Sequence, residues 1–132
     1  MAKATPEMIQ MVNDIMAACC ERNARRIQAL CVDDENGGFY CVHSGGEVNK
    51  SLDECIKSLR FKPPAHALEC RTEGYYDGNC GWFFTVFDGE FPDGTPEVIR
   101  GTTVLRKVND EWKVASVHVS EAVPRPERFK LN

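Results

Sequence analysis

The amino-acid sequence predicts a single α+β domain, in which helices come first and antiparallel strands follow. Three observations support this prediction. Apolar residues recur at helical spacing between residues 5 and 31, strand-like runs fill residues 66–120, and short turn sequences separate those runs. The chain contains 132 residues, and about 100–200 residues is typical of one domain with one core. We expect one domain over residues 1–132, with its core at 5–121 and an extended tail at 122–132.

The N-terminal segment is predicted to form a long helix that begins after Thr5. Threonine is a favoured N-cap, and Pro6 suits the first helical position because that position needs no N–H donor. Asn23 is predicted to restart a helix that ends before the Gly37-Gly38 pair. The apolar residues that give the first helix its periodicity are Met8, Met11, Val12, Ile15, Met16 and Cys19.

Residues 39–43 are predicted to form a short strand, and residues 51–60 are predicted to form a second helix. Ser51 and Glu54 have the spacing of a capping box. We therefore expect the Ser51 hydroxyl to accept a hydrogen bond from the Glu54 amide. We expect the Glu54 carboxylate to accept one from the Ser51 amide in return.

Four long strands are predicted in the second half of the chain, at residues 66–76, 80–90, 97–108 and 112–120. The segments between them are rich in the Asp, Asn, Gly and Pro residues that tight hairpin turns require. Consecutive strands should therefore pair antiparallel. Helices followed by such a meander predict helices packed on one face of a curved sheet.

Composition and charge exclude several partners. The 16 Lys and Arg residues against 20 Asp and Glu residues give a net charge of −4, which leaves no basic excess to neutralise nucleic-acid phosphates. No apolar run reaches the ~20 residues that a membrane-spanning helix needs. Glu7 and Asp14 interrupt the N-terminal apolar stretch, which is not typical of a secretory signal. We expect a cytoplasmic protein without a nucleic-acid or membrane partner.

The cysteine pattern predicts neither a disulfide framework nor a metal site. The chain has 7 cysteines, an odd number, with no C-x-x-C pair and no histidine at zinc-finger spacing. In a reducing compartment they are interpreted as small buried apolar residues. The sequence also shows no phosphate-binding glycine loop, no Ser-His-Asp set and no paired carboxylates, so no cofactor is expected.

The order of elements resembles the nuclear transport factor 2-like superfamily, especially its SnoaL-like branch. The segments that carry the resemblance are Arg100-Gly-Thr-Thr-Val-Leu-Arg106 and Trp112-Lys-Val-Ala-Ser-Val-His-Val-Ser120. The second segment is also similar to the last strand of the calcium/calmodulin-dependent kinase II association domain. The resemblance implies a cone-shaped, cystatin-like α+β barrel, in which a curved antiparallel sheet wraps around the N-terminal helix. It also implies a mostly apolar pocket, but it specifies no reaction, because this superfamily includes enzymes and assembly domains.

Similarity to the ketosteroid isomerases, which share this fold, implies candidate site residues. Their catalytic base corresponds to His43, which precedes a turn at residues 44–46. Their oxyanion-stabilising Asp corresponds to Thr103 and a helical Tyr to Ile15, so both acidic donors are absent and ketosteroid isomerase chemistry in its known form is not expected. Periodicity alone leaves open which face of the last strand lines the pocket. The resemblance implies a pocket lined by Phe84, Val86, Val117 and Val119, with Trp82 near its mouth or floor.

His43 is the strongest candidate for chemistry, because imidazole is the side chain that gains or loses a proton near neutral pH. The alternative is a solvated histidine at a strand end. His118 and His66 are interpreted as structural residues.

Two functions remain open. The first is a small-molecule-binding protein that acts on an apolar or aromatic substrate as a cofactor-independent isomerase, dehydratase or cyclase. In it, His43 moves the proton and Thr103 positions a substrate oxygen. The second is a non-catalytic ligand-binding or assembly module. In both cases we expect a homodimer formed through the outer face of the sheet.

Overall fold

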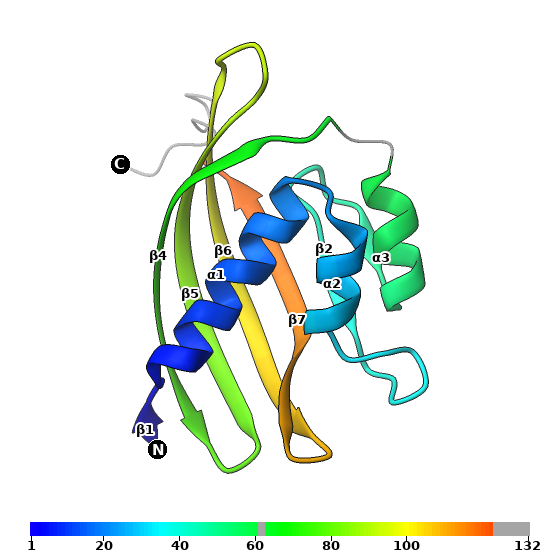
Figure 1. The fold of residues 1–132 in the computed structure, drawn as a ribbon, viewed down its shortest axis with the longest axis vertical. Helices are drawn as coiled ribbons and strands as arrows, with labels where there is room; N and C mark the ends of the chain where they lie inside the picture. The colour runs from blue at the N-terminus through cyan, green and yellow to red at the C-terminus, as the bar shows by residue number, and fades with distance from the viewer. Residues whose placement is uncertain (61–62, 123–132) are drawn as a thin grey trace, which may run out of the picture.

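The computed structural model describes residues 1–60 and 63–122, and its largest element is a curved sheet (Figure 1). The strands are β1 (Ala2–Lys3), β2 (Tyr40–Val42), β3 (Val48–Asn49), β4 (His66–Asp77), β5 (Cys80–Glu90), β6 (Pro96–Val108) and β7 (Glu111–Glu121). Their order in the sheet is β1-β4-β5-β6-β7-β2-β3. The sheet is curved but not closed, because the two-residue strands β1 and β3 lie at its edges. The predicted α+β class is confirmed.

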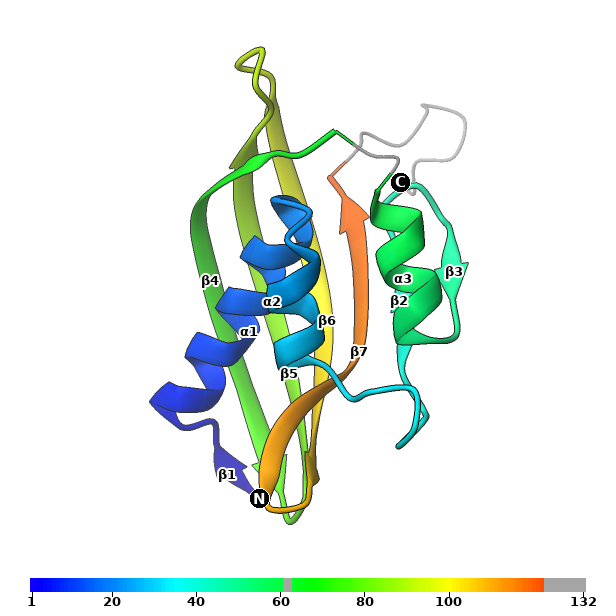
Figure 2. The same cartoon turned by 45° about the vertical axis from the view of Figure 1, so that its right-hand side comes forward.

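The described helices are α1 (Pro6–Cys20), α2 (Ala24–Leu30) and α3 (Leu52–Leu59). Helix α1 crosses the concave face of the sheet, and α2 and α3 continue this layer toward β2 and β3 (Figures 1 and 2). The predicted caps of α1 and α2 are confirmed. The Thr5 hydroxyl accepts a hydrogen bond from the Met8 N–H at 3.3 Å, and the Asn23 amide oxygen accepts one from the Arg26 N–H at 3.1 Å.

The cap of α3 differs from the prediction in one hydrogen bond. The Ser51 hydroxyl accepts from the Glu54 N–H at 3.1 Å, as expected. The Glu54 carboxylate, however, accepts from the Lys50 N–H at 2.9 Å, one residue before the predicted donor. The Asp34 carboxylate accepts from the Leu52 N–H at 2.7 Å, so a distant loop also bonds an N–H group of the first turn that has no partner within the helix.

Strands β4 to β7 form the predicted antiparallel meander. Its turns contain residues with positive φ, namely Gly78, Gly94, Asn109 and Asp110, as tight hairpins require. Strand β2 instead runs parallel to β7, with Cys41 opposite Val117. This pairing joins segments that are far apart in the chain, and it places β2 beside β7 in the sheet.

The long strands alternate between a buried face and an outer face, as their pleat requires. On β5, Phe83 and Phe87 are buried under the helices, whereas Trp82 and Phe84 are 42% and 43% exposed on the opposite face. The fully or almost fully buried side chains of the core include Val12, Ile15, Ile27, Phe39, Cys55, Phe87, Leu105 and Val114.

The face of β7 that points to the core, which periodicity left open, changes at a bulge where β7 pairs with Val104 and Leu105 of β6. Leu105 is paired with Val114, and Thr103 is paired with Val117. Because a bulge inserts one extra residue, Val114 and Val117 both face the core although they are an odd number of residues apart.

Most of the predicted C-terminal tail, at 122–132, falls outside the described residues. No helix in the part of the chain that the structure describes is long and apolar enough to cross a membrane.

Candidate functional site

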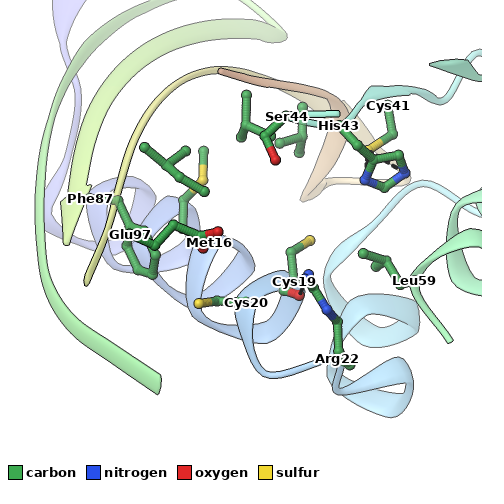
Figure 3. A pocket seen from close by; sticks show the side chains of 13 residues that line it. Met16, Cys19, Cys20, Arg22, Cys41, His43, Ser44, Leu59, Phe87 and Glu97 are labelled. Carbon is green, nitrogen blue, oxygen red and sulfur yellow. Dashed lines mark hydrogen bonds between the residues drawn. The ribbon is translucent and has the colours of Figure 1, made fainter. Parts of the chain in front are cut away.

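A cavity of about 50 Å³ lies between the C-terminal end of α1, the inner face of the sheet and the residues that follow β2 (Figure 3). A single water needs about 10–15 Å³, so this volume holds several waters or a compact organic group. The apolar walls are Met16, Leu59, Phe87, Ile99, Val117 and Val119. The groups with polar atoms are Cys19, Cys20, Arg22, Cys41, His43, Ser44 and Glu97.

Arg22 brings a positive charge to the cavity from the end of α1. Its backbone has φ 59°, a left-handed conformation that ends the helix and turns the chain toward α2. Its Nη1 donates to the Cys19 carbonyl at 2.6 Å, and its Nη2 donates to the Pro63 carbonyl at 3.2 Å. Its Nε is buried and has no hydrogen-bond partner among the described residues. Since a buried donor without an acceptor costs about 1–3 kcal/mol, this arrangement favours a ligand that accepts a hydrogen bond.

His43 follows β2 directly and is 6% exposed. Its backbone N–H donates to the Glu47 carbonyl at 3.0 Å, and its ring Nε2 lies 2.5 Å from Asn49 Oδ1 on β3. An amide oxygen can only accept a hydrogen bond, so Nε2 carries the proton and Nδ1 keeps its lone pair. The β2–β3 turn therefore fixes the ring, and Nδ1, which keeps a lone pair, lies 3.9 Å from the Cys41 sulfur.

Glu97 projects from β6 on the side of the cavity away from His43 (Figure 3). Burial raises the pKa of its carboxyl group, the nearby Glu121 raises it further, and Arg22 partly offsets both effects. A carboxyl group with a raised pKa keeps its proton to higher pH, so it can donate a hydrogen bond or a proton closer to neutrality.

A group of sulfur and nitrogen atoms lies beside the cavity. Cys41 and His43 are two residues apart along the β2 segment, so their side chains point to the same side, and Cys55 on α3 meets them there. The sulfur atoms of the two cysteines and a ring nitrogen of His43 all lie within 4.8 Å of one another. The pKa of the Cys41 thiol is raised, first by its hydrogen bond with Cys55 and then by burial. Both cysteines are thiols and neither forms a disulfide.

The structure brings together only some of the residues that the sequence singled out. His43, Val117 and Val119 line the cavity. Ile15 and Thr103 are buried at 0% and 1% exposure but are not among the lining residues. The Thr103 hydroxyl is one of the buried groups without a hydrogen-bond partner in the described part of the chain.

Trp82, Phe84 and Val86 do not line this cavity. They share the outer face of β5, because Phe83, Thr85 and Phe87 occupy the alternate, buried positions of that strand. The expected pocket wall on β5 is instead supplied by Phe87.

Sequence reasoning missed Arg22, Glu97 and the role of Cys41 in this cavity. Arg22 lies just before Asn23, the predicted helix restart, and a chain reversal between two helices is a position from which a long side chain can reach inward. Glu97 and Thr103 are an even number of residues apart on β6, so their side chains lie on the same face of the strand. The choice of Thr103 as a candidate could therefore have pointed to Glu97. No local pattern around Cys41 indicates its distant neighbour Cys55.

The fold and the cavity define this protein as a small α+β domain in which a curved sheet and its covering helices surround a mostly apolar cavity. It belongs to the SnoaL-like domain family, which it matches over residues 9–126. No curated protein matches the sequence.

Solved structures share the fold at low sequence identity. A protein described as a calcium/calmodulin-dependent protein kinase type II association domain, from Thiobacillus denitrificans, is 18% identical with a TM-score of 0.73, covering 90% of this chain and 96% of that one. A protein described as a dehydratase of the nuclear transport factor 2-like family, from Streptomyces avermitilis, is 17% identical with a TM-score of 0.72, covering 91% and 100%. A ketosteroid isomerase-like protein from Erwinia carotovora atroseptica is 15% identical with a TM-score of 0.64, covering 91% and 100%. These similarities establish the architecture alone.

Proposed function

We propose that this protein binds a small, mostly apolar molecule that carries a carbonyl or carboxylate group. The observation that supports this most directly is that Arg22 lines the mostly apolar cavity while its buried Nε has no hydrogen-bond partner in the described residues. A ligand oxygen placed against this N–H would form a charge-assisted hydrogen bond, which is stronger than a neutral one. The ligand's apolar part would contact Val117 and Val119.

We further propose that the bound molecule undergoes proton transfer without a cofactor, as in an isomerase, dehydratase or cyclase. His43 would act as the base through Nδ1, because Asn49 holds the proton on Nε2. Glu97, with its raised pKa, would act as the acid on the other side of the cavity. The unpartnered Thr103 hydroxyl would stabilise a ligand oxygen that reaches past Val117, its neighbour on β7. Similar structures described as a dehydratase and a ketosteroid isomerase-like protein support this chemistry.

Ligand binding is tested by nuclear magnetic resonance with ¹⁵N-labelled protein and the pair benzoate and benzamide, which differ in charge but hardly in shape. We expect benzoate to shift the resonances of cavity residues at lower concentration than benzamide does. Arg22→Met keeps the aliphatic stem and removes the guanidinium group, so it should weaken benzoate binding about 10–100-fold, the equivalent of one charge-assisted hydrogen bond. The control is Arg25→Met, on the exposed side of α2. Equal binding of both compounds, unaffected by Arg22→Met, would rule out the proposed ligand class.

Proton transfer is tested with cyclohexanone in deuterated water. The wild-type protein should accelerate deuterium incorporation next to the carbonyl group, and His43→Gln should abolish the acceleration. Ligand binding with no acceleration in the wild type would leave a binding protein without this catalytic activity.

The second candidate function is assembly of two copies through the outer face of the sheet. Tyr75, Trp82, Phe84 and Val98 are 40–43% exposed and lie on neighbouring strands of this face. Large apolar side chains gathered on one face are typical of an interface. Glu73 and Arg100 lie on opposite sides of this aromatic strip, so a two-fold axis through it would bring opposite charges together. The similar structures described as association domains also support self-assembly.

Light scattering tests the assembly. We expect twice the mass of one chain at micromolar concentration, and a single-chain mass for Phe84→Lys. Val48→Lys is the matched control, because Val48 is also exposed but lies on the distant edge strand β3. A monomer throughout the micromolar range would contradict the assembly.

A further inference from the structure

The thiols of Cys41 and Cys55 and the ring of His43 meet in the interior, although no spacing in the sequence connects them. All three residues are buried, at 3%, 1% and 6% exposure. Cys41 lies on β2, His43 directly follows this strand, and Cys55 lies on α3. Two sulfur atoms and one imidazole nitrogen are the donors that zinc prefers in proteins.

The hydrogen bond of His43 is the one that a metal-binding histidine needs. Metal-ligating histidines almost always donate their other ring N–H to a carbonyl or carboxylate oxygen, which orients the ring. Here Nε2 lies against Asn49 Oδ1. The Cys41 sulfur is 3.9 Å from Nδ1 and 3.8 Å from Nε2, and with Nε2 held by Asn49, Nδ1 is the nitrogen left with a lone pair. This second observation is independent of the clustering of the three donors.

We propose that Cys41, His43 and Cys55 bind one Zn²⁺ ion, with the fourth coordination position open to the cavity. Cys41 and His43 both line the cavity, so the open position would face the space where a ligand is expected. Three protein ligands with one open position is the arrangement of catalytic zinc sites, whereas structural zinc sites have four protein ligands.

To bind zinc, the three donor atoms would have to move closer together. With Zn–S and Zn–N bonds of about 2.3 and 2.0 Å in a tetrahedral site, the sulfur and nitrogen atoms lie roughly 3.5 Å apart. The Cys41 sulfur lies about equally close to the two ring nitrogens of His43, at 3.9 Å from Nδ1 and 3.8 Å from Nε2. The longest separation in the group is within 4.8 Å, so each side chain would move by a fraction of an ångström to about one ångström.

Metal binding would also change the protonation of the two thiols. Without a metal, the hydrogen bond with Cys55 and then burial raise the pKa of the Cys41 thiol and favour its neutral form. Zinc binds the thiolate, so two S–H protons are released to solvent as two Zn–S bonds form, and the charge of the ion is balanced by the two thiolates. A buried neutral site therefore results, without an uncompensated charge.

This inference is independent of the proposed ligand, but it restricts the role of His43. Nδ1 cannot hold zinc and remove a proton at the same time. In a zinc-loaded protein the ligand oxygen would face the metal, whereas in the metal-free protein it would face Arg22 and the base.

The full chain, purified with its thiols reduced and treated with a chelator, is titrated with Zn²⁺ alone and with Co²⁺ alone. We expect one ion per chain, release of about two protons per zinc near neutral pH, and thiolate-to-cobalt charge-transfer absorption together with tetrahedral cobalt bands. These measurements on the wild type need no variant that could fail to fold.

Variants then assign the ligands. Cys55→Ser and His43→Gln should each abolish stoichiometric binding, and Asn49→Ala should weaken it about 10–100-fold through the orientation of the ring. Cys70→Ser is the matched control, because Cys70 is also a shielded thiol whose pKa burial raises to about 11 but is not part of the group. Circular dichroism checks that each variant folds. Binding of less than one ion per chain, a cobalt spectrum without thiolate bands, or equal binding by Cys55→Ser and the control would overturn the proposal. Loss of zinc binding with retained benzoate binding would leave the proposed function standing.

Discussion

Gly101 lies where a single added methyl group would reduce the cavity without disturbing the backbone. It is on the inner face of β6, opposite Val119 on β7. An alanine Cβ at this position would lie 2.8 Å from the Met16 methyl carbon and 3.2 Å from Val119 Cγ1, whereas ordinary contact begins at 3.4 Å. Met16 and Val119 both line the cavity, so the displaced side chains would move into it.

The cost to stability should be small. Overpacking a core costs about 1–3 kcal/mol, and the flexible methionine end favours the lower limit. Replacing glycine by alanine restores about 0.4–1 kcal/mol by restricting the unfolded chain. We expect Gly101→Ala to lower stability by about 1 kcal/mol or less, which is a fall in Tm of about 4 °C at most. Benzoate affinity should fall by about tenfold or more, because one added carbon atom in a close-fitting pocket changes binding by about 1–3 kcal/mol.

Thermal unfolding followed by circular dichroism and benzoate titration followed by nuclear magnetic resonance measure the two effects separately. An unchanged benzoate affinity in a folded variant would show that benzoate binds elsewhere. A fall in Tm of more than about 10 °C would show that Met16 cannot adapt, and the packing argument would be refuted.

Three further variants test the fold and the electrostatics around the cavity. Gly74→Ala should lower the free energy of unfolding by about 3 kcal/mol or more, which is far more than Gly101→Ala. The reason is that the alanine Cβ would overlap the rigid backbone carbonyl of Trp82 on β5. A Tm within about 4 °C of the wild type would refute this. Ile15→Ala should lower the free energy of unfolding, measured with denaturant, by about 2–5 kcal/mol, because Ile15 is fully buried under the sheet. A decrease below about 1 kcal/mol would contradict the place of Ile15 in the core. Glu97→Gln should raise Tm near neutral pH and have no effect well below the usual range of carboxyl groups. Since burial raises the pKa of Glu97, its ionisation costs stability, and that cost is absent in acid and grows as the pH rises through the folded-state pKa. Thermal unfolding over a pH series measures this, and a variant that is less stable than the wild type at neutral pH would show that the attraction to Arg22 outweighs burial.

Part of the candidate site could be predicted from the sequence, because it rests on local geometry. The resemblance to the ketosteroid isomerases points to His43, which is titratable and precedes a glycine turn, and to Val117 and Val119, and these three residues line the cavity. The resemblance also places Phe84 in the pocket and Trp82 near it, whereas both side chains lie on the outer face of β5. A strand with apolar residues on both faces contains no internal signal of which face is buried.

The sequence by itself determined the helices, the antiparallel meander and the turns that join its strands. Each depends on interactions over a few residues, such as the Thr5 and Asn23 caps and the positive-φ turns at Gly78 and Gly94.

Only the tertiary structure decided which side chains meet. The parallel pairing of β2 with β7 and the packing of α3 bring His43 to Cys55, and the end of α1 brings Arg22 to the same cavity as Glu97. These contacts join residues far apart in the chain. They form when the apolar faces of the whole domain are buried together, and a pattern within a few neighbouring residues does not indicate such contacts.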